Sequence, residues 1–580
     1  MKTFPFLGTV FFSLLFHVSL RAASADFIYE GVNYRIKNDT AEVSVNRWDL
    51  EGDIVIPSKV EYEGKEYVVG KILPRAFYYC FFLNSITLPN SLTKIGDKAF
   101  VGCSSLNSIT IPNSVTFIDK NVFSRCSNLE SITVDEENSI YDSRNDCNAI
   151  METATNTLIT GCAKTIIPQE TECIGEDAFA YNSIIDSIYI PAKVTVIELN
   201  AFRSCNNLKR IIVDSENPVY DSRENCNALI ETATNTFITG CGNSFVPDGI
   251  ESIDGYAFEN TPIDSLFIPK SVRKIGFGVT ADCSNLVSIE VDPENSTYLS
   301  DGNTIIKKGG DGALIAGCNT TVIPDYVEKI DVYSIVAPGL KSLVIPQSVR
   351  MIGTVAIMGY YMKEIQFVSK EAPQLKNMAF NSIIYPLNFY VPVSSEGYKE
   401  QLKIAYPNDD IDKGFIVREY AKSCGELSTS QVYVLKDYKT RDCLVYDAEK
   451  GQLCTLPLDS TYSESLAEHS WQVIDQGEGV CLYNLGANKY LTADEENGYA
   501  LSDTPVTLSL NDDADGVSIE GGSTFIFVYN NVLEPKNPTT GIEDLSQSCS
   551  SSSTSYSLNG CLTKNSQGII VMDGKIVMVK

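Results

Sequence analysis

The sequence predicts a mainly β protein: a solenoid of 23-residue coils with projecting hairpins, followed by a small all-β domain. Three observations lead to this fold class. A 23-residue unit recurs in register within residues 81–410, every third unit is lengthened by about ten residues, and β-type patterning without the repeat fills residues 415–533. Units of this kind bury their apolar positions only by stacking on their neighbours, so the array is expected to form one long domain.

The chain begins with a segment that has the pattern of a signal peptide. Lys2 precedes an apolar run that ends at Leu20, and Ala23-Ser24-Ala25 forms a small-x-small cleavage site. A membrane anchor is the alternative, but the apolar run is short for a transmembrane helix. We therefore expect residues 1–25 to be removed and the remaining chain, without a transmembrane segment, to be exported and either secreted or held at the cell surface.

The repeat unit is clearest in two consecutive copies. Residues 83–103 read LNSITLPNSLTKIGDKAFVGC and residues 106–126 read LNSITIPNSVTFIDKNVFSRC. Each copy holds two short β-branched runs that alternate with a period of two residues and are separated by a Pro-x-Ser corner. Because proline lacks a backbone donor, this corner marks the end of a strand. One copy therefore corresponds to one coil of the solenoid.

A second, longer period is superimposed on the first. Most coils carry proline at the corner, but every third coil carries an aspartate, at Asp135, Asp214 and Asp292. The next corner after Asp135 is Pro168, which is 33 residues away instead of 23. The array is thus three super-repeats of about 79 residues, each ending in a long coil.

The coil closely resembles that of the BspA-like leucine-rich-repeat surface protein family of the Bacteroidota type, whose hallmark is IPxSVxxIGxxAFxxC. This resemblance implies a right-handed leucine-rich-repeat solenoid, with an N-terminal cap at residues 26–80 and a C-terminal cap that includes residues 387–403. It further implies an exported cell-surface protein that mediates adhesion or protein–protein interaction. The expected partners are host extracellular-matrix proteins or the surface proteins of other cells.

The long coils predict hairpins that project from the solenoid. In residues 134–162 and 213–241, hydrophobic pairs flank the turn-forming sequence TATN. Cys147 would then face Cys162 near the base of the first hairpin, and Cys226 would face Cys241 in the second. A cross-strand disulfide in each hairpin is the resulting hypothesis.

The same long coils begin with an acidic D-x-E-N motif. In the first copy it supplies Asp135, Glu137 and Asn138, whose oxygen atoms are of the type that calcium prefers. The alternative is that the Asp and Asn side chains hydrogen-bond the backbone of a tight turn. We favour the turn because no EF-hand-like loop accompanies the motif, and we expect neither a metal nor a cofactor.

Composition argues against several classes of function. The chain has 74 acidic and 45 basic residues, a net charge of −29, so nucleic acid is not an expected partner. It has only two histidines, and His17 lies in the expected signal peptide, which leaves His469. A site with two histidine ligands is excluded, and a carboxylate-based glycosidase is an alternative that no residue pair supports. We predict no catalytic residues and no enzymatic activity.

The C-terminal third is expected to contain three further parts. Residues 415–533 form an all-β domain of the size of a barrel or trefoil, and its stretch from Trp471 to Leu491 resembles a subdomain of ricin-type trefoils. That resemblance implies a second candidate function, glycan binding, through Trp471, Tyr483, Asn484 and Tyr490; the alternative places these aromatic residues in the core. Residues 534–555 form a Ser/Pro linker. Residues 556–580 are expected to be short strands and resemble the sorting or surface-attachment tails of exported Bacteroidota proteins.

Overall fold

The computed structural model describes residues 27–382 apart from residues 47 and 48, then residues 387–407 and 411–421, most of residues 426–529, and short strands between residues 555 and 579. The expected signal peptide and nearly all of the expected linker lie outside these ranges. The chain divides into two compact units. The first contains residues up to 389 together with 397–416, and the second contains residues 390–396 together with residues from 417 onward.

The first unit begins with a small mixed sheet. Its first three strands form an antiparallel meander, and the third then pairs in parallel with β6, which continues the ladder into the coils. Val32 and Tyr34 of the meander are fully buried and close the end of the hydrophobic core. The strands are β1 (Phe27–Tyr29), β2 (Val32–Lys37), β3 (Thr40–Val43), β4 (Glu51–Val55), β5 (Lys59–Tyr62) and β6 (Lys65–Ile72).

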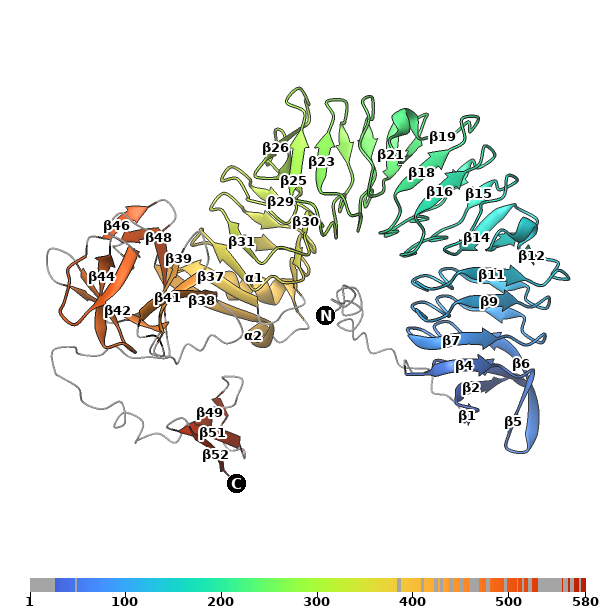
Figure 1. Ribbon diagram of the computed structural model, residues 1–580, viewed down its shortest axis with the longest axis horizontal. Helices are drawn as coiled ribbons and strands as arrows, with labels where there is room; N and C mark the ends of the chain where they lie inside the picture. The colour runs from blue at the N-terminus through green and yellow to red at the C-terminus, as the bar shows by residue number, and fades with distance from the viewer. Residues whose placement is uncertain are drawn as a thin grey trace. The chain divides into compact units, whose positions relative to one another are not determined.

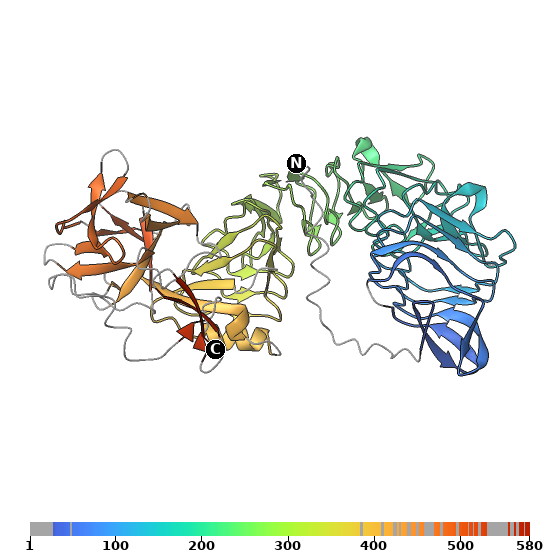
Figure 2. The same cartoon turned by 60° about the horizontal axis from the view of Figure 1, so that its bottom comes forward.

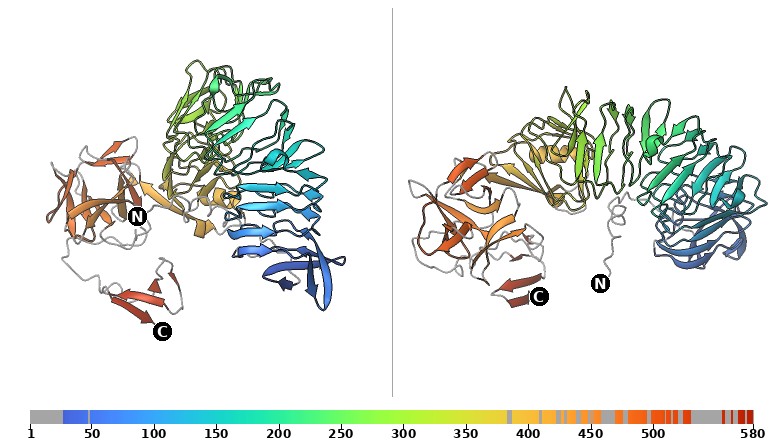
Figure 3. Two further views of the ribbon diagram at one scale, coloured as in Figure 1. Left: turned by 45° about the vertical axis from the view of Figure 1, so that its right-hand side comes forward. Right: turned by 45° about the horizontal axis from the view of Figure 1, so that its top comes forward.

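The coils stack along a curved path in the first unit (Figure 1), and Figures 2 and 3 show the same stacking from other directions. In each super-repeat, the strand that precedes the corner of the second coil pairs in parallel and without a register shift with its counterpart in the long coil, for example Ser108 with Ser131, whereas the strand Phe82–Thr87 of the first coil pairs with β4. Its residues alternate between exposed and buried, as the period of two predicts. These strands are β7 (Phe82–Thr87), β9 (Ser108–Ile111), β11 (Ser131–Val134), β16 (Ser187–Ile190), β18 (Arg210–Val213), β23 (Ser265–Ile268), β25 (Ser288–Val291), β31 (Ser342–Ile345) and β34 (Glu364–Phe367).

A second parallel ladder runs after the corner. It consists of two-residue strands whose second residue points inward, as Ile95 and Ile118 do. The Pro89 carbonyl accepts the Leu92 backbone N–H at 3.0 Å, which closes the corner. The strands are β8 (Lys94–Ile95), β10 (Phe117–Ile118), β15 (Cys173–Ile174), β17 (Val196–Ile197), β22 (Ser252–Ile253), β24 (Lys274–Ile275), β29 (Lys329–Ile330), β32 (Met351–Ile352) and β35 (Gln374–Leu375).

The AFxxC segment of each coil supplies the bulk of the core. Phe100 stacks between Phe77 and Phe123, with ring centroids 5.1 and 5.4 Å apart. The Cys103 thiol is buried and donates to the Phe77 carbonyl of the preceding coil at 3.1 Å. The repeat cysteine therefore acts as a small core residue that also satisfies a carbonyl of the neighbouring coil.

The hairpins of the long coils form, but their strands lie within the solenoid. The hairpin strand β14 pairs in parallel with β15 of the following coil, and β21 pairs likewise with β22. Ala149, Ile150 and Met151 are all buried, whereas a hairpin standing free of the solenoid would expose one face. Only the turn between the strands is exposed. The strands are β12 (Tyr141–Asp142), β13 (Ala149–Glu152), β14 (Thr157–Gly161), β19 (Tyr220–Asp221), β20 (Leu229–Glu231), β21 (Thr236–Thr239), β26 (Tyr298–Asp301), β27 (Thr304–Lys307) and β28 (Leu314–Ala316).

The far end of the first unit is closed by aromatic residues and a short helix. The helix α1 (Tyr398–Ala405) directs Tyr398 against Phe367, with ring centroids 4.9 Å apart, and the Tyr398 hydroxyl donates to the Ser369 carbonyl at 2.7 Å. A three-strand parallel ladder runs beside it. The remaining elements here are β30 (Ile335–Val336), β33 (Ile357–Gly359), β36 (Phe380–Ser382), β37 (Leu387–Pro392), of which the first three residues belong to this unit, and α2 (Ile411–Gly414).

The second unit is an antiparallel all-β structure, as expected. Its central strand β39 pairs with β48 and β42, and Tyr433 packs edge to face on Phe527 in the core. Its strands are β38 (Phe415–Ala421), of which residues 417–421 belong to this unit, β39 (Val432–Asp437), β40 (Asp442–Asp447), β41 (Gln452–Pro457), β42 (Trp471–Asp475), β43 (Val480–Asn484), β44 (Lys489–Asp494), β45 (Gly498–Ser502), β46 (Leu510–Asp513), β47 (Gly516–Ile519) and β48 (Thr524–Tyr529). Near the terminus, β51 (Gly568–Met572) pairs antiparallel with β52 (Lys575–Val579), and β49 (Ser555–Tyr556) pairs with β50 (Leu562–Thr563). In the ranges given above, no helix is long and apolar enough to cross a membrane.

Candidate interaction site on the long coils

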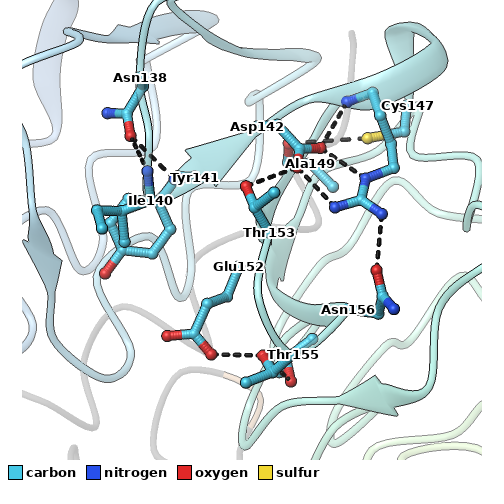
Figure 4. A network of polar contacts seen from close by, with 12 residues as sticks. Asn138, Ile140, Tyr141, Asp142, Cys147, Ala149, Glu152, Thr153, Thr155 and Asn156 are labelled. Carbon is cyan, nitrogen blue, oxygen red and sulfur yellow. Dashed lines mark hydrogen bonds and ion pairs between the residues drawn. The ribbon is translucent and has the colours of Figure 1, made fainter.

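The first long coil carries a network of polar contacts that includes Asp142, Thr153 and Asn156 (Figure 4), and Arg144 joins these residues. The Arg144 guanidinium donates to both carboxylate oxygens of Asp142, at 2.7 and 2.6 Å, and to the Asn156 side-chain oxygen at 2.8 Å. The Thr153 hydroxyl also donates to Asp142, at 2.8 Å. The network therefore ties the loop after β12 to the turn of the β13–β14 hairpin.

The electrostatics of the network favour an ionised Asp142. Burial opposes ionisation, but the hydrogen bonds from the Arg144 side chain, the Arg144 backbone N–H and the Thr153 hydroxyl outweigh it. The pKa of Asp142 accordingly lies below its ordinary value. The bidentate geometry also fixes the orientation of the guanidinium, as is usual for an arginine–carboxylate pair.

The second long coil repeats the same network. Arg223 donates to Asp221 at 2.8 and 2.6 Å and to Asn235 at 3.0 Å, and Thr232 donates to Asp221 at 2.8 Å. The third long coil lacks the DSR sequence, and Gly302 lies in its shorter loop instead. The protein therefore presents two matched copies of this surface, one super-repeat apart.

The loop that the arginine holds has an unusual backbone. Asn145, Asp146 and Asn148 adopt positive φ angles of 56°, 51° and 52°. In the second copy Glu224 adopts the same conformation, with φ at 58°, although glutamate has no special tendency toward it. Unlike residues adopt the same conformation in the two copies, which indicates that the contacts of the arginine, rather than the loop residues themselves, set the shape of the loop.

The DxEN motif at the start of the long coil is used by the backbone. The Asn138 amide donates to the carbonyls of Pro112 and Val115, at 2.8 and 3.0 Å, and its oxygen accepts the N–H groups of Ile140 and Tyr141, both at 2.9 Å. The Asp135 carboxylate accepts the N–H of Glu137 at 3.0 Å. These contacts are those of the turn alternative, and no group of three metal-ligating side chains occurs in the part of the chain that the structure describes.

The cysteines of the hairpins do not form the disulfides of the sequence hypothesis. Cys147, Cys162, Cys226 and Cys241 are all free thiols. The reason lies in the two faces of the buried hairpin: Cys147 packs with the coils that follow it, whereas Cys162 packs with the coils that precede it and donates to the Asn148 carbonyl at 3.3 Å. Cys226 and Cys241 divide between two core clusters in the same way.

The glycan-binding candidates in the second unit lie in its interior. Trp471 and Asn484 are fully buried, and Tyr483 and Tyr490 are exposed by less than a tenth. The Trp471 indole donates to the Leu444 carbonyl at 2.9 Å, and the Asn484 side-chain oxygen accepts the N–H groups of Gly486 and Ala487 in the adjoining turn. Tyr483 and Tyr490 pack on each other with ring centroids 5.0 Å apart. These are the contacts of core residues, as the core alternative expects.

A ladder of arginine and aromatic residues was not indicated by the sequence. The Arg125 guanidinium lies 3.8 Å from the centre of the Tyr181 ring, and Arg203 lies 4.5 Å from that of Tyr256. Arg203 also forms a two-bond ion pair with Glu259 of a later coil. These residues stand at variable positions of the repeat, so only the stacking of the coils brings them together. The Arg144 network did leave a signal, because DSR and TN recur at the same positions in both inserts.

Comparison with known proteins agrees with the repeat. A profile of the BspA type leucine rich repeat region matches residues 70–160, 157–244, 239–303 and 316–399, in six copies. None of the curated protein sequences matches the chain.

Three of the solved structures that match this chain are bacterial proteins. A leucine rich cell surface protein from Faecalibacterium prausnitzii is 21% identical, the alignment covering 65% of this chain and 97% of that one, with a TM-score of 0.33. The pneumococcal vaccine antigen PcpA is 17% identical, with 68% and 99% covered and a TM-score of 0.30. A leucine-rich repeat protein from Bacteroides ovatus is 20% identical, with 68% and 99% covered and a TM-score of 0.26.

Proposed function

Because the chain belongs to the BspA-type leucine-rich repeat family, we propose that it is an exported cell-surface protein that adheres to host extracellular-matrix proteins or to the surface proteins of other cells. The observation that carries this proposal is the stack of coils in the first unit. Its parallel ladders hold a long series of exposed side chains on a fixed frame. Such extended surfaces suit macromolecular partners.

The long coils are the part of this surface that we assign to the partner. Two loops of the same backbone conformation, each fixed by an Arg–Asp pair, lie one super-repeat apart, and each is tied to a hairpin turn with the same sequence, TATN. Matched sites on one rigid frame increase the affinity for a partner that can reach both of them. The net charge of −29 favours a basic or neutral partner surface, and binding should weaken as ionic strength rises.

The test measures capture of a panel of purified matrix proteins by the immobilised protein. The informative variant is the pair Ala154→Arg and Ala233→Arg, which adds bulk and charge at the exposed tips of the first two hairpins. Deleting the hairpins would be unsuitable, because their strands are part of the core. The matched control is Asp311→Arg, on the exposed turn of the third long coil, which lacks the DSR sequence and its arginine.

We expect the double variant to lose about tenfold or more in affinity, since steric and charge conflicts at an interface cost several kcal/mol, and the control to bind normally. Equal binding by all three proteins would contradict the role of the long coils. No capture of any matrix or cell-surface protein would contradict the proposed adhesion itself. Protease treatment of intact cells, which removes only exposed proteins, tests the surface location separately.

A further inference from the structure

A groove opens on the second long coil. It has a volume of about 400 Å³ and lies between the coil of β17 and the coil of β22, over the β20–β21 hairpin. Its lining includes Leu199 and Asn200, Thr234 and Thr236 of the hairpin, and Tyr256. This volume falls in the range of small-ligand sites, which is also enough for one or two side chains of a partner.

The groove is open because two particular residues fail to meet across it. Leu199 occupies the position of Lys120 in the first super-repeat, and Gly255 occupies that of Glu176. Lys120 and Glu176 form an ion pair at 2.5 Å, which spans the corresponding place in the first super-repeat. Leu199 cannot form such a pair, and Gly255 has no side chain.

The third super-repeat closes the same position by another means. Phe277 stands where Leu199 does, and its ring lies 6.2 Å from that of Tyr333, which belongs to the coil after the third long coil. The first and third super-repeats therefore bridge this position, and the second leaves it open. Leu199 is 72% exposed at its rim, although an apolar side chain gains nothing from that position in the isolated chain.

The lining of the groove has an excess of negative charge. Three acidic residues belong to its lining, Glu198, Glu231 and Asp254, and the Glu198 carboxylate also accepts the backbone N–H of Glu176 in the preceding coil at 2.9 Å. Its one cation, Arg203, is already paired through two hydrogen bonds with Glu259. None of the three carboxylates forms an ion pair within the part of the chain that the structure describes.

The carboxylates are close enough to influence one another. Burial raises the pKa of Asp254, Lys274 lowers it, and the Glu231 carboxylate raises it again, so that the pKa of Asp254 lies above its ordinary value. A cation placed between Asp254 and Glu231 would remove this repulsion. The Thr234 hydroxyl donates to the Glu231 carboxylate, and the Tyr256 ring already carries the Arg203 guanidinium 4.5 Å from its centre. The groups that the lining offers to an alkylammonium or guanidinium ion are therefore the carboxylates of Glu231 and Asp254.

We propose that this groove binds a lysine or arginine side chain from a basic segment of the protein partner, with its aliphatic stem against Leu199 and its charged head between Glu231 and Asp254. The inference rests on the proposed function and specifies the chemistry of the partner. It also distinguishes the three super-repeats: the second holds the basic segment, and the bridged positions of the first and third do not.

The test uses the purified protein and a fluorescently labelled pentalysine peptide, with a pentaglutamate peptide as the negative probe. The key variant is Leu199→Lys, which tethers an ammonium group at the rim of the groove. The matched control is Ile166→Lys, which adds the same charge at a residue that is 74% exposed and lies outside the groove. Both variants have the same net charge, so nonspecific attraction to an acidic protein affects them equally.

We expect Leu199→Lys to weaken pentalysine binding about tenfold or more relative to Ile166→Lys, because a like charge within a site costs far more than one at a distance. The pair Glu231→Gln and Asp254→Asn should weaken binding as well. Equal affinity of Leu199→Lys and Ile166→Lys for pentalysine would overturn the proposal. It would also be overturned if the protein bound a neutral glycan and Leu199→Lys abolished that binding while pentalysine binding persisted. Capture of matrix proteins that Leu199→Lys leaves intact would overturn this inference but not the proposed function. If Leu199→Lys weakens pentalysine binding but the protein captures no matrix or surface protein, the result would contradict the proposed function and not this inference.

Discussion

The substitution Asp282→Asn should change how the stability of the solenoid depends on pH. The Asp282 carboxylate lies in the turn before Cys283 and accepts a hydrogen bond from the Tyr360 hydroxyl at 2.6 Å. Burial raises the pKa of Asp282 from 3.8 to about 6; the bond from Tyr360 opposes this rise, and the charge of Glu259 adds to it. Asparagine keeps an oxygen acceptor for Tyr360 but cannot ionise.

The direction of the effect follows from proton linkage. Between about pH 4 and pH 6 the folded state holds a proton on Asp282 that the unfolded state releases, so stability falls as pH rises through this window and is level above it. A shift from 3.8 to about 6 corresponds to about 3 kcal/mol. The asparagine variant should therefore be more stable than the parent by up to about 3 kcal/mol at pH 7, and this advantage should vanish near pH 4.

Hydrogen exchange of the coil that contains Asp282 is the suitable assay, because a long solenoid need not unfold in one step. The ratio of protection in variant and parent at the same pH cancels the chemistry of exchange. It should rise about a hundredfold between pH 4 and pH 7. A ratio that stays constant across this range would refute the reasoning. The variant Asp311→Asn, on an exposed turn, serves as the control and should show no such rise.

Three further predictions concern the long coils. Arg144→Ala should destabilise the first super-repeat by about 2 kcal/mol in urea unfolding, since it removes charge-assisted hydrogen bonds. Arg223→Ala should destabilise the second super-repeat by a similar amount, because its contacts are the same. A clear difference between the two losses would contradict the matched geometry. Asn138→Ala leaves two carbonyls and two N–H groups without their partner and should cost about 3 kcal/mol, a prediction that a loss below 1 kcal/mol would refute. Cys147 and Cys162 should both be alkylated after unfolding without reductant, as mass spectrometry would show, whereas protection of both until reduction would restore the disulfide hypothesis.

The coil was predictable because its pattern is local. The alternation in the ITIP segment at 109–112 places Ile109 and Ile111 inward, and the proline after them ends the strand, as the structure confirms. The AF pair at 99–100 and the cysteine three residues later recur at one step of the coil, so their burial follows from the repeat itself. The same regularity identified the long coils as insertions and their TATN sequences as turns.

The candidate site was only partly predictable. The recurrence of Asp142, Arg144 and Asn156 in the second insert could have shown that these residues act together, but sequence alone does not state that the arginine reaches across to the hairpin turn. The cysteines were misleading because two residues at the base of a hairpin are neighbours in the pairing scheme, while their thiols turn toward opposite faces of a buried layer.

By itself the sequence determined the unit of structure, because a 23-residue unit with apolar residues at fixed places can bury them only by stacking on neighbouring coils. Only the tertiary structure decided which surface side chains meet, because Arg203 and Glu259 stand 56 residues apart and Leu199 faces Gly255 across an intervening hairpin. Such pairs occupy variable positions that the repeat leaves unconstrained. Whether a place between two coils is bridged or open therefore depends on residues that no single repeat contains, and the groove of the second super-repeat is the result.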